Sequence, residues 1–235
     1  MKVHVPAAIL VSMFASISVL AQTTVIINLP NEAPAKSTLS AAEQKVMDKN
    51  ILPKVRKKLA GESCEESVDV AGVVRGAFTR AGADQTLIFY QFCQTGNGLG
   101  STGVALIENG KAVGSWVSAE SGWTMEAKAL PDINQNGVNE VAFYYSGGMH
   151  QGEGGTGVDI MEFSGNTLTG IGWFQAEGFT EKTDNAYKVT VKTGRMPTFY
   201  REKWIATRTP GKYRKLGNPL PLKLKPVFGS FEAVK

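Results

Sequence analysis

Alternation of apolar and polar side chains is the main pattern of this chain, and it has the period of a β-strand. Within 187–192, tyrosine and valine alternate with lysine and threonine, and the runs 87–90 and 141–145 are rich in branched and aromatic residues. A period of two is typical of a half-buried strand, and these residue types favour strands. Asn109-Gly110, between two such runs, predicts a tight hairpin turn. We therefore expect residues 62–235 to form a β domain.

The segment 39–61 has a different period and predicts a helix. Its apolar residues recur at helical spacing. Ser40, followed three residues later by Glu43, is the pattern of a capping box, which marks the first turn of a helix. Pro53 lies inside the segment, so we expect it to kink the helix or divide it in two.

The first residues have the pattern of a secretory signal peptide. Lys2 gives a positive start, residues 5–21 carry no charge, and Ala21 is small enough to precede a cleavage site. The alternative is a membrane helix, but the apolar stretch is short, contains serines and has no basic residue directly after it. We expect a cleaved signal peptide at 1–21, followed by a linker at 22–38 in which a short strand is an alternative.

Export would place the two cysteines of the chain, Cys64 and Cys93, in an oxidising compartment. Two thiols in a secreted or periplasmic protein usually pair, so the sequence predicts a disulfide between them. The alternative is a pair of unrelated buried thiols. No later stretch is apolar enough to span a bilayer, so we expect no transmembrane segment after signal cleavage.

Sliding the chain by 54 residues places one β-like segment on another. Eight residues in about two dozen then coincide without a gap. The matched pairs include Phe89-Tyr90 with Phe143-Tyr144, Thr102–Val104 with Thr156–Val158, and Glu108 with Glu162. We therefore interpret 78–117 and 132–174 as two copies of one unit, with a faint third copy in 194–216.

Each copy predicts a strand, a glycine-rich loop, a strand, a turn and a strand. Units of this length with several strands favour the blades of a β-propeller, but closed propellers typically need four or more blades. The fold class expected is mainly β, with two propeller-blade-like antiparallel units, the faint third copy and an N-terminal helix. An open stack, a sandwich and closure by oligomerisation all remain as alternatives.

One segment has the oxygen-rich pattern of a calcium loop. Residues with oxygen-bearing side chains stand at positions 1, 3, 5 and 9 of a tight turn with glycine at position 6. Calcium prefers six to eight hard oxygen ligands, and alternate residues of such a loop can point at one centre. The expected Ca²⁺ ligands are Asp132, Asn134, Asn136, the backbone carbonyl of Val138, and Glu140. The alternative is a turn rich in Asx residues that holds no metal.

With strand-like residues directly after it, this loop resembles the calcium loop of FG-GAP (VCBS-type) repeats, the blades of integrin-α-like propellers. The match covers 132–141, and the whole blade about 130–174. The resemblance implies a propeller-like unit, calcium held between strands and a role in extracellular binding or adhesion, and it implies no catalytic residues. The literal Phe-Gly and Gly-Ala-Pro landmarks are absent, and the first copy has lost the ligands, so one site is expected.

Charge is distributed unevenly along the chain. The formal net charge is +4, yet 195–225 holds nine basic residues and one acidic residue, within a basic C-terminal β segment at 186–226. Such a segment could contact a polyanion such as an anionic lipid surface or a glycan, or it could be the solvated face of hairpins. Nucleic acid is not an expected partner of an exported chain.

Catalytic motifs are few. After signal cleavage, the single histidine is His150, and the chain has neither a Gly-x-Ser-x-Gly elbow nor a Walker loop. The sequence therefore favours a non-enzymatic, calcium-stabilised binding or scaffold module for an unknown extracellular or envelope ligand. The alternative is a secreted hydrolase that uses a carboxylate pair, with Glu153 and Glu177 as candidates.

Overall fold

The computed structural model describes residues 23–31, 38–59, 68–94, 100–121, 123–150, 153–227 and 229–235. The predicted signal peptide lies outside these residues. Cys64 and the side chain of Cys93 also lie outside the description, so the disulfide stays a prediction.

The elements are short helices followed by many strands. In chain order they are β1 (Thr23–Asn28), α1 (Ala41–Val46), the π-helical turn η1 (Met47–Ile51), α2 (Leu52–Lys58), β2 (Val68–Gly76), β3 (Gln85–Gln94), β4 (Gly100–Glu108), β5 (Lys111–Ser121), β6 (Trp123–Ala129), β7 (Val141–His150), β8 (Glu153–Ser164), β9 (Thr167–Phe179), β10 (Asp184–Lys192), β11 (Thr198–Ala206), β12 (Tyr213–Leu222) and β13 (Glu232–Ala233). The mainly β class is therefore confirmed.

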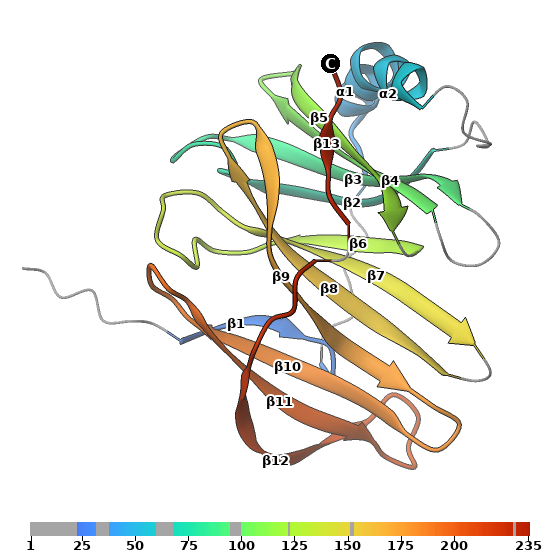
Figure 1. The fold of residues 1–235 in the computed structure, drawn as a ribbon, viewed down its shortest axis with the longest axis vertical. Helices are drawn as coiled ribbons and strands as arrows, with labels where there is room; N and C mark the ends of the chain where they lie inside the picture. Colours follow the sequence, from blue (N-terminus) through green and yellow to red (C-terminus); the bar gives the residue numbers. More distant parts are fainter. Residues whose placement is uncertain are drawn as a thin grey trace, which may run out of the picture.

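The strands form two antiparallel sheets. The small sheet has the order β13-β5-β4-β3-β2, and the large sheet has the order β12-β11-β10-β9-β8-β7-β6, with β1 paired to β10. In Figure 1 the helices cover the outer side of the small sheet, and β10–β12 lie at the opposite end of the molecule. Neither sheet closes on itself within the described strands.

The helical segment forms as its end signals predict. Ser40 Oγ accepts a hydrogen bond from Glu43 N at 3.3 Å, and Ser40 N donates to Glu43 Oε2 at 2.8 Å, which confirms the capping box. Pro53 stands in the first turn of α2, directly after η1. Because proline has no N–H and its ring crowds the preceding turn, it divides the helix, as expected.

Two local features of the N-terminal half also follow from sequence. Both central residues of the β4–β5 turn have positive φ, at 49° for Asn109 and 70° for Gly110, which confirms the predicted hairpin. Within the segment interpreted as a linker, residues 23–28 form β1 and pair with β10, so the alternative of a short strand is found there.

Aromatic side chains fill the space between the two sheets. Phe89 of β3 and Phe143 of β7 are fully buried and stack face to face, with ring centroids 4.2 Å apart and planes inclined by 15°. Trp116 packs edge-on against Phe163 at 4.9 Å, and its indole N–H donates to the carbonyl of Asn166 at 2.9 Å. This cluster fixes how the two sheets face each other.

The two segments interpreted as copies share their strand order but not their register. Each belongs to a four-stranded meander, β2–β5 or β6–β9. Phe89 lies opposite Val104, whereas Phe143 lies opposite Asp159, one residue beyond Val158. A shift of one residue turns side chains to the other face, so Val104 lies between the sheets and Val158 in the core on the far side. The ungapped offset is therefore not kept, and the repeat and its blade-like nature stay predictions.

The last described residues, 223–227 and 229–234, lead from the large sheet to the small one, and we call them the strap (Figure 1). Trp173 N and Lys225 N each donate to the other residue's carbonyl, at 2.7 and 2.9 Å. Further along, β13 pairs with β5. Phe231 enters the aromatic cluster, 5.9 Å from the ring of Phe143, so the strap ties the two sheets together.

Removal of one stacked ring should weaken the whole fold. We expect Phe143→Ala to lower the free energy of unfolding by about 3–5 kcal/mol, because a fully buried ring leaves a cavity. Urea denaturation measures the change, and Met196→Ala, at a residue 89 % exposed, is the control with little effect. A loss for Phe143→Ala below about 1 kcal/mol would show that the sheets do not depend on this contact.

Candidate functional site

A cleft of about 630 Å³ opens between the sheets, next to the aromatic cluster. Its floor is the face of β7 and β8 that carries Gly147, Gly155 and Gly157. A Cβ on Gly155 would lie 2.3 Å from the backbone oxygen of Glu177, and one on Gly157 would lie 2.6 Å from Nε1 of Trp173. The backbone of Glu177 and the ring of Trp173 thus pack against Gly155 and Gly157, whereas a Cβ on Gly147 would meet nothing within 4 Å, so the backbone of β7 is open to the cleft there.

Aromatic rings form much of the wall. The aromatic lining residues are Tyr145, Trp173, Phe179, Tyr187 and Phe231. They come from β7, β9, β10 and the strap, so the cleft exists only where the sheets and the strap meet. Ser118 of β5 lines it from the small sheet.

Asp159 is the most buried charged group of the cleft. It lies on β8 between Phe143 and Trp173 and is 6 % exposed. Its Oδ1 has no hydrogen-bond partner among the described residues. Burial raises the pKa of Asp159 to about 7, and burial together with the charge of Asp159 raises the pKa of Tyr145 well above its ordinary value.

The predicted calcium loop folds into a series of Asx turns. The carboxylate of Asp132 accepts hydrogen bonds from Asn136 N at 3.0 Å and Gly137 N at 2.8 Å. Asn134 Oδ1 accepts from Asn136 N at 3.1 Å, and Asn136 Oδ1 accepts from Val138 N at 3.0 Å. These oxygens thus point into the loop, and each keeps a second lone pair for another partner.

Glu140 is fully buried beneath this loop. Its Oε2 accepts from Ile133 N at 2.8 Å, whereas Oε1 has no hydrogen-bond partner in the described part of the chain. Burial, with smaller contributions from the charges of Asp132 and Glu162, raises the pKa of Glu140 to about 7, against the lowering effect of the hydrogen bond from Ile133 N. The structure thus places the carboxyl group of Glu140 beneath the loop that holds Asp132, and their joint binding of calcium stays a prediction.

Glu162 of β8 is a residue of this site that the sequence analysis missed. Its Oε2 accepts from Asn134 Nδ2 at 2.7 Å and Asn136 Nδ2 at 3.0 Å. Within the described residues, no three His, Cys, Asp or Glu side chains are grouped so that they could hold a metal ion by themselves. Any ion here would need the amide and backbone oxygens as well.

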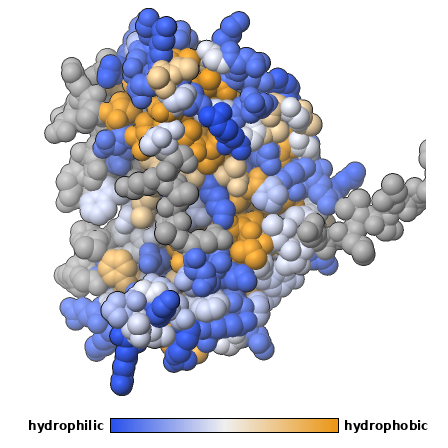
Figure 2. Space-filling view, turned by 180° about the vertical axis from the view of Figure 1, so that it is seen from behind, coloured by the Kyte–Doolittle hydropathy of each residue, from blue (hydrophilic) through white to orange (hydrophobic). Residues whose placement is uncertain are grey.

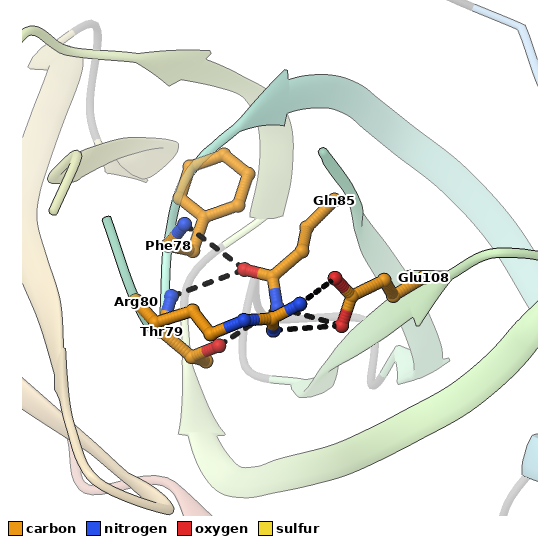
Figure 3. Close-up of polar contacts among 5 residues, drawn as sticks. All are labelled: Phe78, Thr79, Arg80, Gln85 and Glu108. Atoms are coloured by element: carbon orange, nitrogen blue, oxygen red, sulfur yellow. Dashed lines mark hydrogen bonds and ion pairs between the residues drawn. The ribbon is translucent and has the colours of Figure 1, made fainter. Parts of the chain in front are cut away.

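The corresponding loop of the first copy is closed by a basic side chain (Figure 3). Arg80 forms a two-pronged ion pair with Glu108, the residue that the 54-residue offset matches to Glu162. Gln85 Oε1 accepts from Phe78 N and Thr79 N, both at 3.0 Å. The match of Glu108 with Glu162 was thus a sequence signal for the missed residue.

The two glutamates proposed for a hydrolase do not lie together. Glu153 lines the cleft, whereas Glu177 accepts a hydrogen bond from Thr156 Oγ1 at 2.8 Å on the other face of the large sheet. Thr156 alternates with Gly155 and Gly157 along β8, which places it on that other face. The side chain of His150 lies outside the described residues.

Several basic residues of 195–225 have partners within the molecule. Arg201 lies over the ring of Tyr187 at 5.1 Å, Lys225 lies over the ring of Trp173 at 5.4 Å, and Lys215 forms an ion pair with Glu202. The end of the molecule that holds β11 and β12 is mostly hydrophilic in Figure 2. Contact with a polyanion stays a prediction. None of the described helices has the length and apolar character needed to cross a bilayer.

Comparison with known proteins supplies no relative for this chain. No family model matches it, and neither the curated proteins nor the solved structures contain a significant match.

Stability should fall as the pH rises, because Asp159 binds its proton more tightly in the folded state than in the unfolded one. Its pKa rises from 3.8 to about 7 on folding, so stability is lost between those values, by up to about 4 kcal/mol. Urea denaturation at several pH values measures this, and Asp159→Asn should remove that part of the slope. Asp69→Asn, at an exposed residue, is the control. An unchanged slope in Asp159→Asn contradicts the prediction.

Proposed function

We propose that this chain is an exported, non-enzymatic binding module that holds a small ligand in the cleft between its sheets. The observation that carries the proposal is the glycine floor of a cleft of about 630 Å³. Ligand sites of small molecules are clefts of roughly 300–1,000 Å³, lined by apolar and aromatic side chains with a few polar groups. The lining of this cleft has that composition.

The glycines are costly unless something approaches them. Glycine weakens a strand because it adds conformational entropy to the unfolded chain and packs no side chain. Gly155 and Gly157 are needed for close internal packing, but a Cβ on Gly147 would meet nothing within 4 Å. An open glycine in a strand beside aromatic walls is suited to a ligand that lies against the backbone.

A calcium ion in the acidic loop is the second part of the proposal. The residues that would hold it are Asp132, Asn134, Asn136, the carbonyl of Val138, and Glu140. The buried Oε1 of Glu140 supports this fit, because it lacks a partner that a cation would supply. In the first copy, the Arg80 guanidinium neutralises the carboxylate of Glu108. In the second copy, a metal ion would neutralise the carboxylates of the acidic loop in the same way. Calcium here would stabilise the connection between β6 and β7 and take no part in catalysis.

The resemblance to FG-GAP repeats is proposed on the same grounds. Two four-stranded meanders, β2–β5 and β6–β9, support blade-like units, and the loop before β7 supports the calcium position. As a binding module of this kind, the chain would work outside the cytoplasm, where calcium is abundant enough for a weak site.

Filling the cleft should abolish ligand binding without damage to the fold. We expect members of a fragment library to shift the indole N–H resonance of Trp173 in NMR spectra, and Gly147→Leu to weaken that binding at least about tenfold. The leucine points into open space, so it fills the cleft without an internal clash. Ala112→Leu, at an exposed residue of β5, is the matched control. If no fragment binds, or if Gly147→Leu binds as well as the native protein, the cleft is not the site.

Calcium should raise the melting temperature of the protein. At a calcium concentration about a hundredfold above Kd, the gain is about 2.7 kcal/mol, or on the order of 5–10 °C for a domain of this size. Scanning calorimetry with EDTA and then with calcium measures this, and Asp132→Ala should not respond, whereas the exposed Asp69→Ala should respond like the native protein. An equal response in Asp132→Ala would place the ion elsewhere, and no response in any protein would leave a loop without metal.

A further inference from the structure

The charges around the cleft indicate what kind of ligand it takes. The charged lining residues that the structure describes are both acids, Glu153 and Asp159. An anionic ligand would meet two carboxylates, and repulsion in a partly desolvated site is costly. A ligand that carries a positive charge would gain from both.

Asp159 is the residue that would pair with a positive charge on the ligand. It is 6 % exposed, and its Oδ1 has no hydrogen-bond partner among the described residues, although it lines an open cleft. A buried carboxylate is strongly disfavoured unless it is paired with a cation or fully hydrogen-bonded. Asp159 is thus an acceptor in the cleft for which the described part of the chain supplies no donor.

The aromatic walls suit the same kind of ligand. Cations bind over the faces of tryptophan and tyrosine rings by attraction to the ring electrons, and aromatic cages bind organic ammonium ions in this way. Trp173 already has a cation on it, since Lys225 Nζ lies 5.4 Å from the ring centroid. Tyr145 and Tyr187 add two more rings to the lining, and Tyr187 also carries a cation, because Arg201 lies 5.1 Å from its ring centroid.

We propose that the cleft binds an organic ammonium ion, held among the rings of Tyr145, Trp173 and Tyr187 with the carboxylate of Asp159 as its counter-ion. This inference rests on the proposed function, namely that the cleft binds a small ligand. The open position at Gly147 lets a compact, substituted ammonium group lie close to the backbone of β7. Lys225 on Trp173 and Arg201 on Tyr187 act as competing cations and limit the affinity.

The test compares choline with 3,3-dimethyl-1-butanol, which has nearly the same shape but no charge. We expect choline to bind with a Kd at least about tenfold lower than that of the alcohol. Isothermal titration calorimetry and the shift of the Trp173 indole N–H resonance measure the two Kd values. Asp159→Asn should weaken choline at least about tenfold and leave the alcohol unchanged, with Asp69→Asn as the control.

Two further measurements test whether the charge of the ligand, rather than its shape, determines its affinity for the cleft. Choline should bind more tightly as the pH rises from about 5 to about 8, because Asp159, whose pKa is about 7, becomes ionised. The other titratable groups described around the cleft are Glu153, Tyr145, Tyr187, Lys225 and Arg201, and the same titration on Asp159→Asn isolates the contribution of Asp159. Lys225→Met should tighten choline binding several-fold, because it removes the competing cation.

Each contrary result has a definite meaning. If the alcohol binds as tightly as choline, the cleft does not recognise positive charge and the inference fails. The same holds if Asp159→Asn changes the affinities for choline and for the alcohol by the same factor. In both cases the proposed binding function stands. If choline and benzyltrimethylammonium both fail to bind at tens of millimolar, the inference also fails. The fragment experiment with Gly147→Leu decides separately whether the cleft binds any ligand, so the two failures are distinguishable.

Discussion

The face-to-face stack of Phe89 on Phe143 determines the spacing between the two sheets, and the cleft depends on that spacing. Packed sheets lie about 10 Å apart because side chains of both fill the gap. Phe143, Asp159 and Trp173 lie side by side on neighbouring strands of the large sheet. At Phe143 the stacked rings fill the gap between the sheets. Farther along β7 and β8, Trp173 packs against Gly157, and the position above Gly147 stays empty, so the cleft remains there as a space that the protein does not fill.

Both candidate sites contain a carboxyl group that lowers the stability of the protein. Asp159 in the cleft and Glu140 beneath the acidic loop are buried, each has an oxygen without a described partner, and burial raises the pKa of both to about 7. A core made for stability alone would hold apolar residues at these positions. Strongly shifted carboxyl groups gather at functional sites because a ligand can supply the missing interaction.

Local signals in the sequence were sufficient for local structure. Ser40 with Glu43 predicted the helix start, Asn109-Gly110 predicted the hairpin, and the period of two predicted strands, because each depends only on neighbours in the chain. The identity match could not reveal the register difference, since pairing is set by the whole sheet. Asp159 was not predicted, because an aspartate in a strand carries no local sign that its face will be covered by the strap.

The strap also determines the order in which the cleft can be assembled. Its residues Gly229 and Phe231 line the cleft, and β13 pairs with β5, so Ala233 lies opposite Trp116, about half of the chain away in sequence. Contacts between residues so distant in sequence form slowly, because the loop between them must first be closed. A ribosome delivers this segment after all the other described strands, so the sheets can pair before the wall of the cleft exists. An early folding intermediate would therefore display the aromatic face of the large sheet to solvent, and during that interval the protein is most open to aggregation and to chaperones.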